Sequence, residues 1–230
     1  MPLDPLQLTG RSRSHLFQSD EPRFAIHVNM VEPFARLREA AAAEGFDIAV
    51  FSGFRDFESQ AEIWNKKFCG ERTLFDADGA VLDYGALSEA ERVQCILNWS
   101  ALPGASRHHW GTDIDVYDRA AVPEGYRVKL LPEEVGPGGV FHRLHSWLDQ
   151  NMARFGFFRP YREYRGGMFP EAWHLSYAPI AIPALEVLTL DLVAQALRDG
   201  DILGKDMVLE RLPEIYQRHV LNISLPLSLP

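Results

Sequence analysis

The chain of 230 residues is long enough for one large domain or two small ones, and its 47% hydrophobic content is that of an ordinary globular protein. Its formal net charge of −9 argues against a nucleic-acid partner and against adhesion to anionic polymers or lipid surfaces, because both require clustered Lys and Arg. The composition therefore favours a small, freely diffusing substrate.

The first six residues contain no basic segment followed by an apolar one, and no run approaches the roughly 18 apolar residues of a membrane span. We therefore expect a soluble protein with no membrane partner. A cytoplasmic location is favoured, or a periplasmic one if a leader has been removed from the sequence given. Nothing in the sequence specifies an oligomeric state.

The N-terminal half shows clear periodic segments after an aperiodic start. Residues 1–26 carry Pro, Ser and Arg without periodicity and are interpreted as an irregular arm. Apolar residues at helical spacing predict a helix over 27–44 that ends at Gly45. A buried strand is predicted over 47–51, followed by a helix over 57–68.

The remaining segments alternate between helices and short strands. Ser88 and Glu91 form a capping box for a helix that extends to about Trp99. The other segments are predicted as strands around 114–116, 127–131 and 157–158, a helix over 140–155 that ends at Gly156, and two C-terminal helices over 180–200 and 206–221.

Helices and short strands are mixed without regular βαβ alternation, which favours the α+β class. We find no internal repeat or linker and expect one compact unit. Its parts are an arm over 1–26, a principal domain over 27–182 and a helical extension over 183–230 packed on the same domain.

Three residues have the chemistry of metal ligands. His108 and Asp115 flank a glycine turn, and His174 follows more than fifty residues later. Two imidazoles and one carboxylate leave a fourth position open, which is typical of a catalytic zinc site. From spacing alone His109 can replace His108 as a ligand, and Asp113 can replace Asp115, since Asp113 and Asp115 share one face of a regular strand.

Four further residues are candidates for catalysis or substrate binding. Glu171, three residues before His174, is the natural general base for a water molecule activated by the metal. Arg55, between a predicted strand and helix, can neutralise an oxyanion or bind a carboxylate. Gln60 is interpreted as a substrate contact or a helix-surface residue, and Ser106 as a substrate contact or a loop cap.

Three ordered motifs resemble the VanY-type D-alanyl-D-alanine carboxypeptidases of the M15 peptidase family. That family shows the patterns SGxR…Q, SxHxxGxAxD and ExWH in this order. In this chain they correspond to Ser52-Gly53-Phe54-Arg55 with Gln60, to Ser106 through Asp115, and to Glu171-Ala172-Trp173-His174. The resemblance covers roughly residues 30–180. Asp113 stands where the family has a small residue, and Ala172 where it usually has Pro.

The resemblance implies a Hedgehog/DD-peptidase fold, with an antiparallel sheet flanked by helices. It also implies a zinc ion held by His108, Asp115 and His174, with Glu171 as catalytic base and Arg55 stabilising the transition state. Ser106, Gln60 and Ser52 are implied to lie near the substrate. The charge of Asp113 is expected to influence the metal or substrate preference.

The implied reaction is release of a terminal D-alanine from peptidoglycan peptides. A cytoplasmic D,D-carboxypeptidase would destroy the cell's own wall precursor, whereas an L,D-carboxypeptidase would trim recovered tetrapeptides. The sequence analysis therefore favours L,D activity in wall recycling over D,D activity on D-Ala-D-Ala termini. A non-catalytic zinc-containing module that binds peptidoglycan is a third hypothesis, which the intact Glu171 and Arg55 disfavour.

Overall fold

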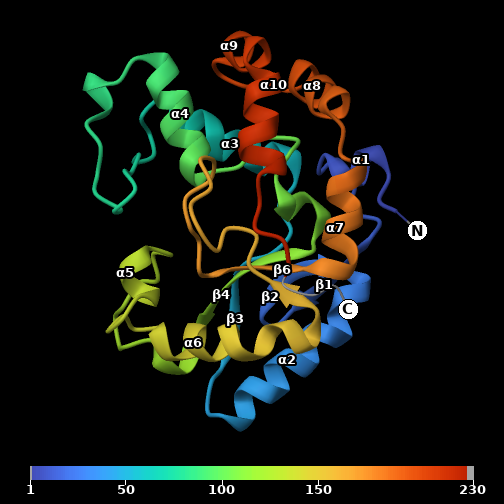
Figure 1. The fold of residues 1–230 in the computed structure, drawn as a ribbon, viewed down its shortest axis with the longest axis vertical. Helices are drawn as coiled ribbons and strands as arrows, with labels where there is room; N and C mark the ends of the chain where they lie inside the picture. Colours follow the sequence, from blue (N-terminus) through green and yellow to red (C-terminus); the bar gives the residue numbers. More distant parts are fainter. Residues whose placement is uncertain (1, 227–230) are drawn as a thin grey trace.

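A computed structural model describes residues 2–226 and contains one four-stranded antiparallel sheet and one separate β-hairpin (Figure 1). The sheet has the order β3-β4-β6-β5 and the hairpin pairs β1 with β2. The strands are β1 (Leu16–Asp20), β2 (Arg23–His27), β3 (Ile48–Ser52), β4 (Asp113–Asp118), β5 (Phe157–Phe158) and β6 (His174–Tyr177).

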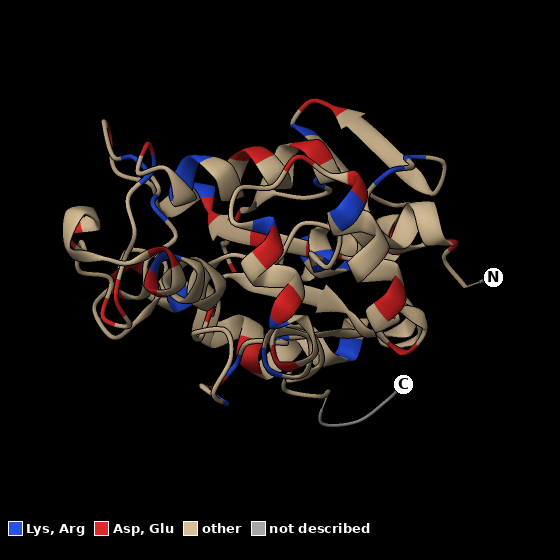
Figure 2. Ribbon diagram, turned by 90° about the horizontal axis from the view of Figure 1, so that it is seen from above, with Lys and Arg blue, Asp and Glu red and all other residues tan. Residues whose placement is uncertain are grey.

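Helices lie on both sides of this sheet, with α2 and α6 on one side and α3, α4 and the C-terminal helices on the other (Figure 1). Their bounds are α1 (Pro5–Leu8), α2 (Val31–Ala43), α3 (Phe57–Phe68), α4 (Glu89–Trp99), α5 (Pro132–Val135), α6 (His142–Asn151), α7 (Ala178–Val187), α8 (Leu190–Asp199), α9 (Lys205–Glu210) and α10 (Leu212–Ile215). Acidic and basic residues are interspersed along these helices (Figure 2).

The alternation of side chains along β4 places apolar residues on one face of the sheet and carboxylates on the other. Ile114 and Val116 point into an apolar core shared with α2 and α6. Asp113 and Asp115 point to the opposite face, because successive residues of a strand alternate. This arrangement places carboxylates on the side covered by α3 and α4, where they can form a site.

The N-terminal arm differs from the predicted irregular segment. It contains α1 and the β1–β2 hairpin, and the hairpin braces two loops of the principal domain. The backbone N–H of His27 donates to the carbonyl of Gly111 over 2.7 Å, and that of Phe54 donates to Ala25 over 2.8 Å. Polar residues outside a period-2 pattern hid these strands, which pair with each other as a local hairpin. Only their contacts with the principal domain join segments that are distant in sequence.

Two other predictions were wrong in detail. Residues 127–131 form no strand, and the two predicted C-terminal helices are divided into α7 to α10 and a π-helical segment, Tyr216–Leu221. Thr189 caps a new helix after α7, so α7 and α8 meet at 81°. Within residues 2–226, no single helix is long and apolar enough to span a membrane.

The C-terminal helices complete the core on the side of α3 and α4. Trp64 of α3 and Ile96 of α4 are fully buried against Leu197 and Val208 of this extension. The indole N–H of Trp64 also donates to the carbonyl of Leu203 over 3.0 Å. The extension therefore supports the helices that carry residues of the cavity described below.

Candidate metal and catalytic site

The strand register brings two candidate ligands together. Asp115 of β4 is paired with His174 of β6, and Asp113 is paired with Ser176. Directly opposite residues of an antiparallel pair point to the same face, with their Cβ atoms about 5 Å apart. Asp115 and His174 therefore meet on the face of the sheet that lies away from Ile114 and Leu175.

His108 reaches the same point from a short 3₁₀ turn, Arg107–Trp110, which ends at Gly111. Gly111 has φ +68° and lies so close to Leu16 and the His27 nitrogen that a Cβ atom would clash, so glycine is required there. The Nδ1–H of His108 donates to the carbonyl of Gly53 over 2.8 Å. This bond leaves Nε2 free to face Asp115.

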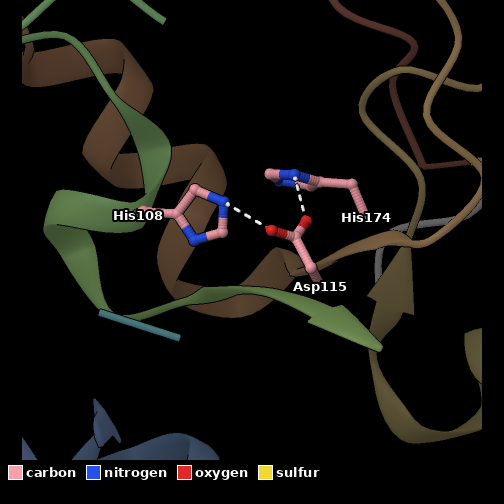
Figure 3. Close-up of side chains that lie close together, drawn as sticks. All are labelled: His108, Asp115 and His174. Atoms are coloured by element: carbon pink, nitrogen blue, oxygen red, sulfur yellow. Dashed lines mark ion pairs between the residues drawn. The ribbon is translucent and has the colours of Figure 1, made fainter. Parts of the chain in front are cut away.

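The free atoms of the three residues converge (Figure 3). His108 Nε2 lies 3.4 Å from one carboxylate oxygen of Asp115, and His174 Nδ1 lies 3.2 Å from the other. One ligand atom from each residue lies within 4.8 Å of the others. Ligands of a tetrahedral zinc ion, roughly 2.0–2.2 Å from the metal, are separated by roughly 3.3–3.6 Å.

The hydrogen-bonding state of these atoms also fits a metal ion. Asp115 Oδ1 and His174 Nδ1 are buried and have no hydrogen-bond partner among the residues that the structure describes. Burial lowers the pKa of His108 to about 4, although Asp115 opposes this effect, so the imidazole is neutral and able to bind a metal. The residues present therefore fit zinc.

The alternative ligand His109 is excluded by its contacts. Its Nδ1–H donates to the carbonyl of Arg55 over 2.6 Å, and its Nε2 accepts from the N–H of Gly104 over 3.1 Å. Both ring nitrogens are thus engaged with the backbone, and burial lowers the pKa of this imidazole to about 3. His109 is a neutral structural residue that fixes the loop carrying Arg55.

Asp113 lies behind the candidate metal site. Its carboxylate accepts from His174 Nε2–H over 2.9 Å and from Arg107 Nε–H over 2.8 Å. The hydroxyls of Thr112 and Ser176 donate to its other oxygen over 2.7 and 3.1 Å. Burial opposes ionisation of Asp113, but Arg107 and His174 outweigh it and lower the pKa of the carboxyl group. Asp113 therefore fixes the tautomer of His174 that leaves Nδ1 free.

This geometry explains the departure from the family pattern at position 113. An ionised carboxylate behind a ligand histidine orients the ring and increases its basicity. The sequence analysis identified the unusual charge of Asp113 but not its partners. Arg107 and Ser176 had no recognisable signal, because their contact with Asp113 depends on the pairing of β4 with β6.

We expect Asp113→Asn to weaken zinc binding by about 10- to 100-fold, the range typical of carboxylates that orient a ligand histidine. Competition with a chromophoric chelator measures the affinity, and the visible spectrum of the cobalt-substituted protein reports the ligand geometry. Asp118→Asn, at the other end of β4, is the matched control and should leave both unchanged. Equal zinc affinity in Asp113→Asn and the wild type would contradict this assignment.

Glu171 is held beside His174 by a tight turn. The backbone N–H of His174 donates to the carbonyl of Glu171 over 3.1 Å, which brings Glu171 Oε2 to 3.5 Å from His174 Nδ1. Residues three apart on a flat strand point to opposite faces, and this turn allows Glu171 and His174 to converge instead. Burial raises the pKa of Glu171 despite its contact with His174, and a raised pKa suits a carboxylate that must accept and return a proton.

Carboxylates surround the His174 imidazole on several sides. Burial lowers its pKa, but the hydrogen bond to Asp113 and the nearby carboxylates of Asp115 and Glu171 outweigh burial and raise the pKa well above its ordinary value. The position therefore favours a positive charge, which either a proton or a metal ion can provide.

Arg55 is braced by the two residues of its own motif. Its guanidinium donates to Ser52 Oγ over 2.8 Å and to Gln60 Oε1 over 2.7 Å. The Gln60 amide also donates to the carbonyl of Ala101 over 2.7 Å and is fully buried. Gln60 and Ser52 were predicted to lie near the substrate, but both hold Arg55 and neither lines the cavity with it. We interpret them as positioning residues.

A cavity of about 300 Å³ opens above the candidate ligands. Its lining includes Arg55, Glu171, Ser106 and the three candidate ligands, so these six sequence-predicted residues face one space. Ser106 is fully buried, and its hydroxyl has no hydrogen-bond partner among residues 2–226. That position favours a substrate contact over a loop cap, since the hydroxyl makes no cap bond.

Comparisons with known proteins agree with this architecture. A family model described as VanY, D-alanyl-D-alanine carboxypeptidase, matches residues 23–180. This span includes every candidate ligand and catalytic residue named above. An uncharacterized protein of Haemophilus influenzae is 33% identical over 121 residues, which cover 52% of this chain and 92% of that protein.

Two solved structures share the fold. VanYB in complex with D-alanine-D-alanine is 24% identical, covers 83% of this chain and 92% of its own, and has a TM-score of 0.53. A variant of the vancomycin resistance D,D-pentapeptidase VanY in complex with Zn(II) is 25% identical, covers 79% and 88%, and has a TM-score of 0.51. The predicted α+β fold of the DD-peptidase type is confirmed.

Proposed function

Because the chain belongs to the VanY family of D-alanyl-D-alanine carboxypeptidases, we propose that it is a zinc-dependent carboxypeptidase that removes the C-terminal D-alanine from peptidoglycan peptides. The observation that carries the proposal is the convergence of His108, Asp115 and His174 with Glu171 and Arg55 in one cavity. A module that only binds peptide has no need of a buried carboxylate beside the ligands.

Each of the candidate ligands and catalytic residues in the cavity has a place in peptide hydrolysis. His108 Nε2, a carboxylate oxygen of Asp115 and His174 Nδ1 would hold zinc, which when bound supplies Lewis-acid activation of water and of the scissile carbonyl. Glu171 takes a proton from the attacking water as the carbon–oxygen bond forms. It returns that proton to the nitrogen as the carbon–nitrogen bond breaks and the D-alanine amine leaves.

Arg55 is positioned to bind the oxygen that becomes negative during this attack. Two of its five N–H groups are used by Ser52 and Gln60, so the guanidinium is fixed before the substrate arrives. Donors that are already oriented stabilise a developing charge most strongly, since they need no rearrangement during the reaction.

For the bond that is cut, we retain L,D-carboxypeptidase activity on tetrapeptides as the leading proposal. It rests on the argument that an enzyme inside the cell can trim recovered tetrapeptides without destroying the wall precursor, and it requires a cytoplasmic location. D,D activity on D-Ala-D-Ala termini is the second candidate, and the description of the matching family model favours it.

The test is a mass-spectrometric assay of the zinc-loaded protein with a matched tetrapeptide and pentapeptide. Release of D-alanine from the tetrapeptide supports the L,D proposal, and release from the pentapeptide alone supports the D,D candidate. Exhaustive chelation should abolish either activity, and added zinc should restore it. Activity that survives chelation would refute zinc dependence, and no product from either peptide would favour a binding module.

A further inference from the structure

Two cations at the cavity have no part in the reaction described above. Lys67 of α3 and Arg72 of the following loop line the same space as Glu171 and Arg55. Neither lies within 4 Å of a carboxylate of the described residues, whereas Arg107 and Lys129, which also line the cavity, are paired with Asp113 and Glu133. Lys67 and Arg72 are thus available to a ligand.

Helix α3 explains why Lys67 lies close to the reacting groups. Residues seven apart share one face of a helix, so Lys67 lies on the face of α3 that carries Gln60, the residue that braces Arg55. Burial lowers the pKa of Lys67 to about 8, and the negative charge of Glu171 partly opposes this effect. Lys67 and Glu171 thus line the same cavity, and their charges attract each other across it.

Hydrogen-bonding capacity remains unused on the wall of this cavity. The Lys67 amino group donates to Ser100 Oγ over 2.6 Å, which uses one of its three N–H groups. Ser106, on the cavity wall, has a buried hydroxyl without a partner among residues 2–226. Burial of the Lys67 charge costs free energy that Glu171 offsets only in part, and an anionic ligand in direct contact would offset more of it.

We propose that Lys67, assisted by Arg72, binds the C-terminal carboxylate of the peptide substrate. This assignment rests on the proposed function, since an exopeptidase must recognise a free chain end. In the residue that leaves, the carboxylate carbon is two bonds from the scissile nitrogen, so its counter-charge must lie beside the base that protonates this nitrogen. Lys67 meets this requirement because it lines the same cavity as Glu171, and Arg72 adds positive charge at the exposed side.

The test compares two versions of whichever peptide the enzyme cleaves, one with a free C-terminal carboxylate and one with a C-terminal amide. The wild type should prefer the free acid by about 10- to 100-fold in kcat/KM, mainly through KM, as expected for a hydrogen bond between charged groups. Lys67→Met should lose activity on the acid by a similar factor and change activity on the amide by less than about threefold. Arg72→Met should have a smaller effect of the same kind.

Lys66→Met is the matched control, because Lys66 is the adjacent residue and its amino group is paired with Glu62 over 2.6 Å. It should retain the preference for the acid, and Lys67→Arg should recover most of it. An equal loss of activity on the acid and the amide in Lys67→Met would mean that Lys67 acts by tuning the protonation of Glu171. That result would overturn the proposal. No loss on the acid would overturn it as well.

A binding measurement separates this proposal from the proposed function. Calorimetric titration of zinc-loaded Glu171→Gln with the same two peptides needs no turnover. The acid should bind about 10- to 100-fold more tightly than the amide, and Lys67→Met in the same background should abolish the difference. If the acid binds more tightly and Lys67→Met abolishes this preference, but the wild type cleaves neither peptide, the proposed enzymatic function is rejected and the carboxylate site is retained. Equal affinity for the acid and the amide would reject the carboxylate site and leave the proposed enzymatic function standing.

Discussion

Glu171→Gln should lower kcat by about 10³- to 10⁴-fold while the protein retains its zinc. The amide has the size of the carboxylate but cannot accept the proton of the attacking water, and general base catalysis contributes up to about 10⁴-fold. The ligand atoms of His108, Asp115 and His174 are untouched by this change. Metal content by atomic emission and turnover by mass spectrometry, on one preparation, test both statements.

The matched control for Glu171→Gln is Glu163→Gln, which removes an exposed carboxylate near Arg162 and Arg165. It should leave metal content, kcat and KM unchanged. Retained turnover in Glu171→Gln would assign proton transfer to another group, and loss of zinc would make Glu171 a ligand. The expected pattern, full zinc with little turnover, also separates an enzyme from a binding module, because a binder needs no base.

The candidate ligands could be identified from the sequence because they belong to short motifs with strict local geometry. His108 and Asp115 flank a turn that requires glycine, and Asp115 alternates with Ile114 and Val116 along β4. A period of two therefore places the carboxylate opposite the apolar core. His174 could be recognised only through its motif, since its pairing with Asp115 is a tertiary contact.

Contacts between distant segments account for what the sequence did not predict. The β1–β2 hairpin was interpreted as an irregular arm, yet its His27 and Ala25 hold the loops of Gly111 and Phe54. Gln60 was weighed as a substrate contact, whereas its amide braces Arg55. The local sequence around Gln60 is the same whether its amide contacts the substrate or braces Arg55. Only the position of the Arg55 guanidinium in the fold decides between these two roles.

The interrupted C-terminal helices illustrate a different cause. Helical periodicity continues across residues 180–200, and it masks the boundary at which Thr189 caps α8. The resulting bend of 81° lets Val193 and Leu197 of α8 pack against the α3–α4 side of the molecule. Tertiary burial of an amphipathic face thus overrides the continuity of the local pattern.

Arg55→Lys should lower kcat by about 10²- to 10³-fold with little change in KM or zinc affinity. Arg55 can hold Ser52 and Gln60 with two N–H groups and still direct others into the cavity, because the guanidinium is a planar fork with five donors. A lysine ammonium is a single point with three donors and cannot span the same set. Removal of one oriented donor to an oxyanion typically costs the factor given.

Steady-state kinetics of Arg55→Lys, with zinc content measured in parallel, provide the test. Arg119→Lys is the matched control, since Arg119 forms an exposed ion pair with Asp47 over 2.7 Å and should tolerate lysine. Gln60→Met keeps the guanidinium but removes one brace, so it should reduce kcat less than Arg55→Lys does. Partial recovery of Arg55→Ala by millimolar guanidinium would identify the missing group as the guanidinium itself. Full activity of Arg55→Lys would instead assign Arg55 to the folding of the loop between β3 and α3.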